Sequence, residues 1–534
     1  MFLKFSVFML LALAPAVLFA SESLDVILAG GTVYNGDGSA GLVTDVGISG
    51  DRIMAVGDLS GRESELRLDL TGLAVVPGFI DIHSHAVRGE VEKSGIFLWP
   101  DAENYIRQGV TTAIGGPDGS SWYPLSELFS MLEESPSAVN FGTFVGHNTV
   151  RKLAMGRADR AATPEEMQAM KEMVASAMIE GAFGLSSGLK YIPGAYAETG
   201  EVIELARVAG EYGGIYISHM REEGVGLLDS VRETIRIGEE GALPAQITHH
   251  KAMGARMWGK SNESLALIDA ANARGLDISS DQYPYAASST GIDVLFPAWS
   301  LAGDEEEQLA RLQDAAVRAK IKTAIIENLM YDRGGNDPSR VAIASCEWNL
   351  ALNGKNLAEI LQERGLEPSM ENAAELAMEL VENGGCSAVY HAMSEEDVVR
   401  IMQHPKTMVA SDGGIFMLNE DMPHPRNYGS FARVLGYYVR EKGVLSFPQA
   451  VHKMTMMPAD RIGLSDRGRI EAGAIADIAV LNPETVIDRA TFSQPHQMSE
   501  GVLHVFVNGQ AVLLNGEMTG ARPGRVLRGF PNKD

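Results

Sequence analysis

The sequence predicts an α/β protein whose main body is a closed barrel of eight strand–helix units. From residue 75 onward, short apolar runs alternate with amphipathic helical segments, a pattern typical of parallel sheets, and about eight such units close into a (β/α)8 barrel. Short strand-like runs with Gly turns occur before residue 75 and return after about residue 466. We therefore expect a barrel over residues 75–465 and one small β domain built from residues 21–74 and 466–534.

The first twenty residues have the profile of a secretory signal peptide. An early cation, Lys4, precedes an apolar core over residues 5–19, and small residues lie close to Ala20. An uncleaved N-terminal anchor is the alternative interpretation. No further apolar stretch approaches the length of a membrane span. We expect export, to a bacterial periplasm or beyond, and no membrane association after cleavage.

Composition restricts the classes of partner. Of the 534 residues, 44 are Lys or Arg and 70 are Asp or Glu, giving a formal net charge of -26, which argues against nucleic acid because its phosphates would be repelled. A small-molecule substrate is the expected partner, and the oligomeric state is left open. Only Cys346 and Cys386 are present, so no disulfide framework holds the fold, and their pairing is left open.

The chain begins, after the leader, with short β-type runs over residues 25–34, 46–49 and 52–57, which predict a small antiparallel sheet. Residues 75–82 then form an apolar run that predicts one strand covered on both faces.

A helix is predicted after Thr163. Thr163 is a suitable N-cap, Pro follows it, and Glu166 is placed for a capping box. Apolar residues then recur at helical spacing until Gly181 ends the run, so the methionines among them are interpreted as core packing.

The same alternation predicts strands over residues 182–187, 215–219, 245–249 and 276–281, and a last one over 407–412. Between about 295 and 340 it is interrupted by an acidic, Ala-rich helical segment and a Gly-rich turn. We interpret this segment as an insertion over the barrel mouth, with a plain surface excursion as the alternative.

Two histidines follow the apolar run at residues 75–82. His83 and His85 are two residues apart, so on an extended backbone their side chains share one face and can bind one ion. Two unrelated polar residues at a strand end are the alternative, which further histidines nearby would exclude.

Further candidates fall at the ends of later strands. His219 ends the fifth predicted strand, His249 the sixth and Asp412 the eighth. Barrel enzymes carry their reactive groups at the carboxyl ends of the strands. Four imidazoles and a carboxylate at that end favour zinc or a similar divalent ion.

The motifs resemble a known superfamily. Residues 77–85 (PGFIDIHSH) are similar to the signature of the amidohydrolase superfamily, and residues 468–478 (GRIEAGAIADI) to its closing segment. Five shorter motifs resemble the N-acyl-D-amino-acid deacylase (D-aminoacylase) branch: residues 181–189, 217–221, 248–251, 281–285 and 424–426.

This resemblance implies a (β/α)8 barrel with a β-sandwich and one or two zinc ions. It assigns metal ligation to His83, His85, His219 and His249, with Asp412 as ligand and proton shuttle. His250 competes with its neighbour for this role, but adjacent residues of a strand point to opposite faces.

The chain departs from the branch in one loop. Members of the branch commonly supply a cysteine ligand after the second strand, whereas residues 109–119 (GVTTAIGGPDG) contain no thiol. The first candidate to replace it is Lys190, as an N-carboxylated bridging ligand, and the second is Asp118. The alternative is a single zinc ion with Lys190 as an ordinary cation.

The predicted activity is hydrolysis of N-acyl-D-amino acids to a carboxylate and a free D-amino acid. Metal-activated water would attack the amide, with Asp412 as general base and then acid. A cyclic-amide hydrolase or dipeptidase on the same metal centre is one alternative, and a non-catalytic barrel that binds a partner is another. The substrate-binding candidates are Arg426 and Lys251 for a carboxylate, and Tyr283, with Ser289 nearby, for the developing oxyanion.

Overall fold

A computed structural model describes residues 23–417 and 421–529 of the chain. The predicted signal peptide lies outside the described residues. Among the residues described, no helix has both the length and the apolar content that crossing a membrane would require.

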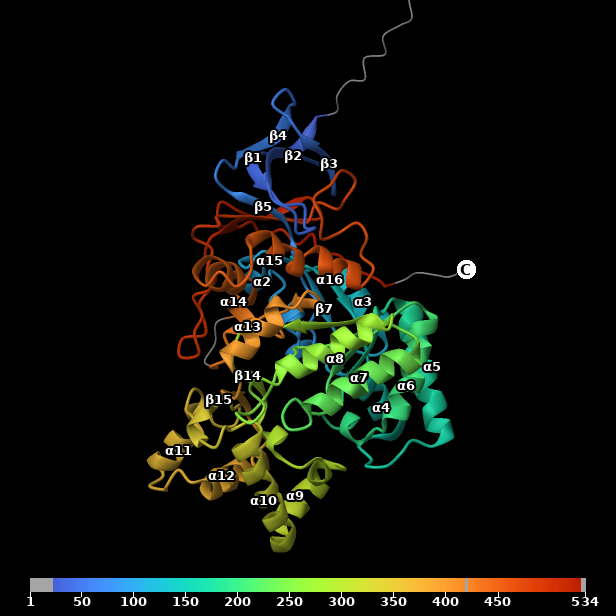
Figure 1. The fold of residues 1–534 in the computed structure, drawn as a ribbon, viewed down its shortest axis with the longest axis vertical. Coiled ribbons are helices and arrows are strands. Elements are labelled where there is room, and N and C mark those ends of the chain that lie inside the picture. Colours follow the sequence, from blue (N-terminus) through green and yellow to red (C-terminus); the bar gives the residue numbers. More distant parts are fainter. Residues whose placement is uncertain (1–22, 418–420, 530–534) are drawn as a thin grey trace, which may run out of the picture.

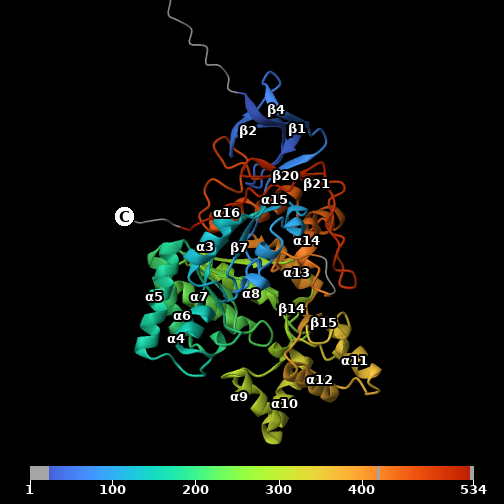
Figure 2. The same cartoon turned by 180° about the vertical axis from the view of Figure 1, so that it is seen from behind.

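One sheet is assembled from both ends of the chain. In the described residues its strands run in the order β21-β20-β19-β18-β5-β1-β2-β3, and β4 also pairs with β1 (Figures 1 and 2). The antiparallel pairing expected for residues 25–34, 46–49 and 52–57 is confirmed in β1, β2 and β3, whereas β4 and β5 pair with β1 in parallel. The strands are β1 (Leu24–Val33), β2 (Leu42–Ser49), β3 (Arg52–Gly57), β4 (Ser64–Asp69), β5 (Ala74–Pro77), β18 (Ile478–Leu481), β19 (Val502–Val507), β20 (Gln510–Leu514) and β21 (Glu517–Met518).

The body of the protein is an α/β fold with parallel strands. One parallel sheet has the order β6-β7-β8 and a second the order β17-β13-β12-β11-β10-β9. A parallel bridge between Ser84 and Gly413 joins the end of β6 to the segment after β17. The strands are β6 (Phe79–Asp81), β7 (Val110–Gly115), β8 (Asn140–Thr143), β9 (Val145–Gly146), β10 (Gly184–Gly188), β11 (Ile215–His219), β12 (Ala245–Ile247), β13 (Ile278–Gln282) and β17 (Thr407–Val409).

Helices follow most of these strands and lie outside them (Figure 1). The helix predicted after Thr163 is confirmed as α5, with its capping box present and Gly181 in the left-handed conformation at its end. Met170, Val174 and Met178 are buried on its inner face. The helices of the body are α1 (Gly95–Leu98), α2 (Glu103–Ile106), α3 (Leu125–Glu134), α4 (His147–Met155), α5 (Pro164–Glu180), α6 (Thr199–Glu211), α7 (Leu227–Gly241), α8 (Ser261–Ala273), α13 (Glu395–Gln403), α14 (Arg426–Arg433), α15 (Phe447–Met454) and α16 (Met456–Arg461).

The apolar run at residues 75–82, expected as one strand, is divided between the two parts of the fold. Its first half is β5, which pairs with β18 in the composite sheet, and its second half is β6, which pairs with β7. Gly78 separates them, and a Cβ there would lie 2.2 Å from Oγ1 of Thr111. The chain changes sheets at this glycine because no larger residue fits against β7.

The excursion expected at residues 295–340 is longer in the structure. It leaves the body at β14 (Ser288–Gly291) and returns after β16 (Ser387–Tyr390), and both strands pair within a separate three-stranded antiparallel sheet with β15 (Val341–Ser345). Cys346 and Cys386 form a disulfide between β15 and β16. The helices of the excursion are α9 (Glu305–Gln313), α10 (Ala315–Tyr331), α11 (Leu357–Glu363) and α12 (Met370–Glu382), which lie together at the end of the molecule opposite the composite sheet (Figure 1).

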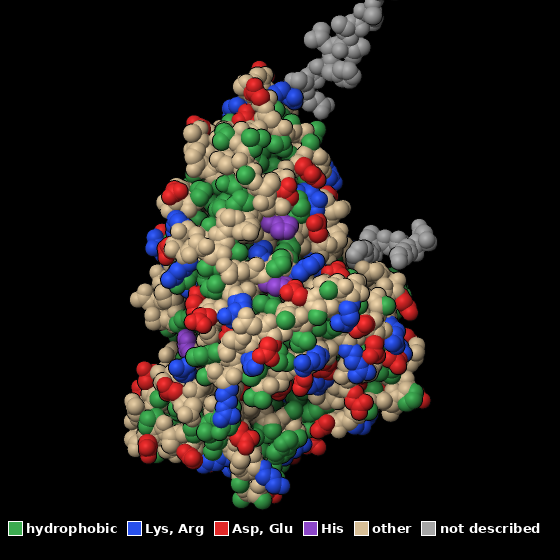
Figure 3. Space-filling model, in the orientation of Figure 1, with side chains coloured by type: hydrophobic (Ala, Val, Ile, Leu, Met, Phe, Trp, Pro, Cys, Tyr) green, Lys and Arg blue, Asp and Glu red, His purple; other side chains and the backbone are tan. Residues whose placement is uncertain are grey.

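Charged side chains of both signs are interspersed over the face of the molecule shown in Figure 3. On this face the acidic side chains are therefore not gathered in one patch.

Candidate metal centre

Side chains from the ends of four strands and from one loop meet at a single point. His83 and His85 lie just beyond β6, and His219 is the last residue of β11. His249 lies two residues past β12, and Asp412 three residues past β17. The loop after β7 adds the sixth member, Asp118. These are the carboxyl ends of parallel strands, where α/β folds place their binding sites.

The six side chains form two groups that could hold a metal ion, and Asp118 belongs to both. In each group the potential ligand atoms lie within 4.8 Å of one another. Oδ1 of Asp118 is 3.5 Å from Nε2 of His83 and 3.4 Å from Nε2 of His249. Oδ2 of Asp118 is 3.5 Å from Nε2 of His85. The two groups are His83, His85, Asp118 and Asp412, and Asp118, His219 and His249.

The backbone at three of these residues is in the left-handed conformation, which residues other than glycine rarely adopt. The φ angles are 55° at Asp118, 35° at His249 and 50° at Asp412. Such conformations cost on the order of 1–3 kcal/mol each and cluster at active sites, although they also occur elsewhere in this chain. Surrounding hydrogen bonds hold them: His249 N donates to Oδ1 of Asp281 over 2.7 Å, and Asp412 N donates to the carbonyl of His83 over 3.0 Å.

The donor set fits a divalent cation. Both ring nitrogens of His83, Nε2 of His219 and Oδ1 of Asp118 are buried without a hydrogen-bond partner. Although burial acts in the opposite direction, the carboxylates of Asp118 and Asp412 hold the pKa of His83 well above its ordinary value, so the site attracts positive charge. Burial lowers the pKa of His219 to about 4, which keeps that imidazole neutral, as a metal ligand must be. Mixed imidazole and carboxylate ligands suit zinc or a similar ion.

Glu223 supports the centre from behind and was not anticipated from the sequence. Its Oε1 lies 3.0 Å from Nδ1 of His249 and 2.5 Å from Nζ of Lys251, and its Oε2 lies 3.3 Å from Arg333. A carboxylate on the second nitrogen of a ligating histidine fixes the orientation of the ring. The sequence feature that could have indicated Glu223 is its position four residues after His219, the residue that ends β11.

Lys190, the first candidate for the missing ligand, belongs to neither of the two metal-binding groups. Its Nζ pairs with Glu222 at 2.9 and 3.0 Å and is 4.0 Å from Asp332, because these acidic groups offer its ammonium an ion pair. The carboxylate that joins the histidines is Asp118, the second choice. His250 points away from the centre: its Nε2 lies 2.9 Å from Oγ of Ser264 on α8, and burial lowers its pKa to about 3.

A cavity of about 1870 Å³ opens onto the metal centre, and residues of the excursion form part of its wall. All four substrate-binding candidates line it, as expected, and each also has a contact within the protein. Nη1 of Arg426 donates to Oδ2 of Asp412 over 2.6 Å, and Lys251 pairs with Glu223. The hydroxyl of Tyr283 donates to the sulfur of Met393 over 3.7 Å, and the carbonyl oxygen of Ser289 accepts from Nη2 of Arg426 over 3.3 Å.

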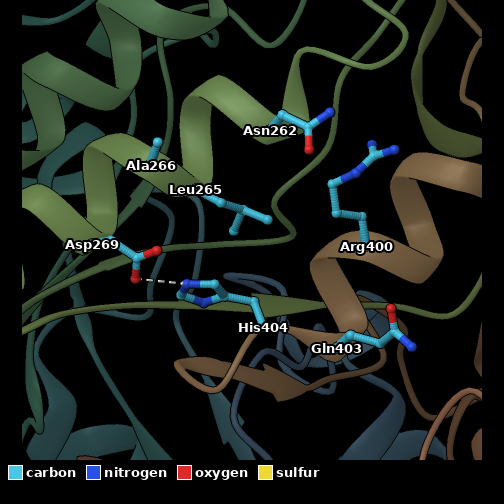
Figure 4. A pocket seen from close by; sticks show the side chains of 7 residues that line it. All are labelled: Asn262, Leu265, Ala266, Asp269, Arg400, Gln403 and His404. Carbon is cyan, nitrogen blue, oxygen red and sulfur yellow. Dashed lines mark hydrogen bonds and ion pairs between the residues drawn. The ribbon is translucent and has the colours of Figure 1, made fainter.

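A second, smaller hollow of about 360 Å³ lies between α8 and α13 (Figure 4). In it Nε2 of His404 pairs with Asp269 at 3.0 Å, and Arg400 pairs with Asp397 at 2.8 Å. Neither metal-binding group found among the described residues includes a residue of this hollow. The large cavity is therefore the candidate active site.

Comparison with known proteins agrees with this geometry. The model of the Amidohydrolase family matches residues 68–513. A D-aminoacylase of Alcaligenes xylosoxydans xylosoxydans is 37% identical over 95% of this chain and 98% of its own length, and an N-acyl-D-glutamate deacylase of the same organism is 38% identical over 95% and 97%. A crystal structure of N-acyl-D-glutamate deacylase from Bordetella bronchiseptica, complexed with zinc and a phosphonate inhibitor, covers 95% of this chain and all of its own with a TM-score of 0.81 at 33% identity. This chain belongs to the amidohydrolase family.

Proposed function

We propose that this protein is a zinc-dependent hydrolase that cleaves the amide bond of N-acyl-D-amino acids, yielding a carboxylate and a free D-amino acid. One observation carries the proposal: two metal-binding groups share Asp118 at the floor of a cavity that also contains Asp412 and Arg426. The relatives named D-aminoacylase and N-acyl-D-glutamate deacylase support the substrate class.

His83, His85, Asp118, His219 and His249 would hold the zinc, as one or two ions. Bound zinc supplies a Lewis acid that lowers the pKa of water and polarises the amide carbonyl. The histidines contribute neutral nitrogen ligands, and the negative charge comes from Asp118, without an N-carboxylated lysine.

Asp412 moves the proton in this mechanism. Burial opposes its ionisation, but the charges of Arg426 and His83 and the hydrogen bond with His85 hold the pKa of Asp412 well below its usual range. The carboxylate is thus ready to take a proton at Oδ1, which lies 3.1 Å from Nε2 of His85. It then delivers that proton to the leaving amine nitrogen.

Arg426 would bind the α-carboxylate of the substrate. Its contacts with Asp412 and the carbonyl of Ser289 occupy two of the five N–H donors of a guanidinium. The remaining donors are available to a planar, bidentate carboxylate. Lys251, which pairs with Glu223 behind His249, would add positive charge to this side of the cavity.

We also propose a closed barrel and a β-sandwich as the architecture of the fold, and export as the fate of the protein. The bridge between Ser84 and Gly413 supports one closed (β/α)8 barrel formed from the two parallel sheets, and the composite sheet supports a separate β-sandwich domain. The sequence of residues 1–20 and the disulfide between Cys346 and Cys386 support export to an oxidising compartment such as the periplasm.

A substrate panel with metal analysis tests the function. Purified protein is assayed with N-acetyl-D-amino acids, their L counterparts, hydantoins and dipeptides, which separates deacylase, cyclic-amide hydrolase and dipeptidase activities. We expect turnover of the D-acyl compounds and stoichiometric zinc by elemental analysis. Turnover of hydantoins or dipeptides alone would overturn the proposed substrate, and metal-free, inactive protein would favour a binding function.

The role of Asp412 is tested with Asp412→Asn. We expect turnover to fall by about 100- to 10,000-fold, the range for losing a general acid–base group, while zinc content is retained by the other ligands. Asp397→Asn, which alters a buried carboxylate bonded to Ser261 and Arg400 outside the cavity, is the matched control. Equal loss of zinc and turnover in Asp412→Asn would contradict a proton-transfer role.

A further inference from the structure

Arg88 is a cation of the active-site cavity to which the mechanism assigns no role. It lies three residues after His85, in the segment that follows β6, and lines the cavity. Its backbone is held by a hydrogen bond of 2.8 Å from its amide to Oγ of Ser94. Its guanidinium lies 5.7 Å from the ring centroid of Phe416, which also lines the cavity. Stacking on an aromatic ring orients a guanidinium while leaving its N–H groups at the edge free.

The guanidinium of Arg88 has no carboxylate partner among the residues that the structure describes. Two other cations of the cavity wall have carboxylate partners: Arg426 pairs with Asp412, and Lys93 pairs with Glu90 at 3.1 Å. The side chain of Arg88 is exposed to the solvent of the cavity. Arg426 lines the same cavity, and its Nη1 is already bound to Oδ2 of Asp412.

The cavity is thus polarised. Its floor carries the carboxylates of Asp118 and Asp412 around the metal-binding histidines, and Arg88 and Arg426 add two positive charges to the wall of the same cavity. Like charges in one cavity repel, and an anion bound between or beside them removes that cost. An N-acyl amino acid with an apolar side chain has one carboxylate, which the remaining donors of Arg426 satisfy.

We propose that Arg88 binds a second carboxylate of the substrate, so that this enzyme prefers N-acyl-D-amino acids with acidic side chains. This inference rests on the proposed deacylase function and adds the substrate class. The α-carboxylate would bind Arg426, and the side-chain carboxylate of a D-aspartate or D-glutamate derivative would bind Arg88. Sequence identity does not distinguish between acidic and apolar substrates, because the D-aminoacylase and the N-acyl-D-glutamate deacylase are almost equally similar to this chain.

The test compares Arg88→Met with the native enzyme in the zinc-loaded form. Methionine keeps an unbranched apolar side chain beside Phe416 and removes the positively charged guanidinium group. The substrates are N-acetyl-D-glutamate and N-acetyl-D-aspartate on one side and N-acetyl-D-methionine on the other. The measured quantity is the ratio of kcat/KM for acidic over apolar substrates, which we expect to be above one in the native enzyme. We expect Arg88→Met to lower it by about 10- to 100-fold, as for the loss of a charge-assisted hydrogen-bonded pair.

Lys93→Met is the matched control, because it removes a positive charge from the same cavity wall but from a side chain that already has its own partner, Glu90. The selectivity ratio should stay within about 2-fold of the native value, as expected for an exposed ion pair. An equal fall of the ratio in both variants would mean that overall charge, not Arg88, sets the preference, and would overturn the proposal.

The remaining outcomes separate the two levels of inference. Native enzyme that prefers N-acetyl-D-methionine, or an Arg88→Met variant that loses activity equally on all substrates, overturns the role of Arg88 while the deacylase function stands. Failure of the native enzyme on every N-acetyl-D-amino acid overturns both. The variant Arg88→Lys keeps the positive charge but lacks the guanidinium group. A selectivity ratio between those of the native enzyme and Arg88→Met would support direct binding of the carboxylate.

Discussion

Replacing Asp118 by asparagine tests whether this carboxylate, rather than Lys190, completes the metal centre. Asparagine has nearly the same shape and is among the few residues that adopt the left-handed conformation, so the φ of 55° at this position is preserved. The substitution therefore removes the negative charge with little effect on the backbone. Alanine would confound the result, because it adds backbone strain of roughly 1–2 kcal/mol.

The expected effect follows from the contacts of Asp118. It is the one residue shared by both metal-binding groups, and its Oδ1 lies 3.4 to 3.6 Å from nitrogens of His83, His219 and His249. Loss of groups that merely orient metal ligands costs about 10- to 100-fold in metal affinity or activity. Loss of a shared ligand should cost at least about 100-fold, or about 2.7 kcal/mol.

The assay is zinc affinity by competition with a chelator, combined with kcat/KM on the substrate found in the panel. Asp293→Asn is a matched control for metal affinity, since Asp293 lines the same cavity and belongs to neither metal-binding group among the described residues. Asp118→Cys has the same backbone strain as Asp118→Ala but should bind zinc more tightly than that variant, because a thiolate is also a negative ligand. Native zinc affinity and activity in Asp118→Asn would refute the assignment.

Three further predictions concern the surroundings of the centre and the scaffold. Lys190→Met should leave zinc content unchanged and lower stability by no more than about 1 kcal/mol, because its partner Glu222 is 43% exposed; loss of zinc by elemental analysis would restore Lys190 as a ligand. Glu223→Gln should weaken zinc binding or activity by about 10- to 100-fold, since Glu223 orients His249; native values in both chelator competition and kinetics would refute this. Thr163→Ala should remove the capping box of α5 and cost about 1 kcal/mol in denaturant unfolding without changing kcat; an unchanged unfolding midpoint would show that the cap contributes nothing.

Local patterns in the sequence were sufficient for the regular parts of the fold. The helix from Pro164 to Glu180 was predicted from its cap, its apolar spacing and its terminal glycine, and it has those ends in the structure. The strands that end near His219 and His249 were predicted from short apolar runs in the same way. These predictions succeed because caps and periodicity act within a few residues of the chain.

The same local reasoning failed where partners are distant in sequence. Residues 75–82 look like one buried strand, but β5 pairs with β18, about 400 residues away, and β6 pairs with β7. The excursion was predicted too short because β15 has the composition of a body strand, and only its antiparallel pairing with β16 assigns it to a separate sheet. An apolar run indicates that a strand is buried, not which sheet contains it.

The sequence by itself predicted a candidate metal centre, because the histidines and Asp412 each stand at a predicted strand end, and parallel strands bring those ends together. Only the tertiary structure placed Asp118 rather than Lys190 among the histidines, Glu223 beside His249, and Arg88 on the wall of the same cavity. Side chains in loops take their direction from distant packing and from the charges they meet. Those interactions act through space between residues far apart in the sequence, so the spacing of residues along the chain does not predict them.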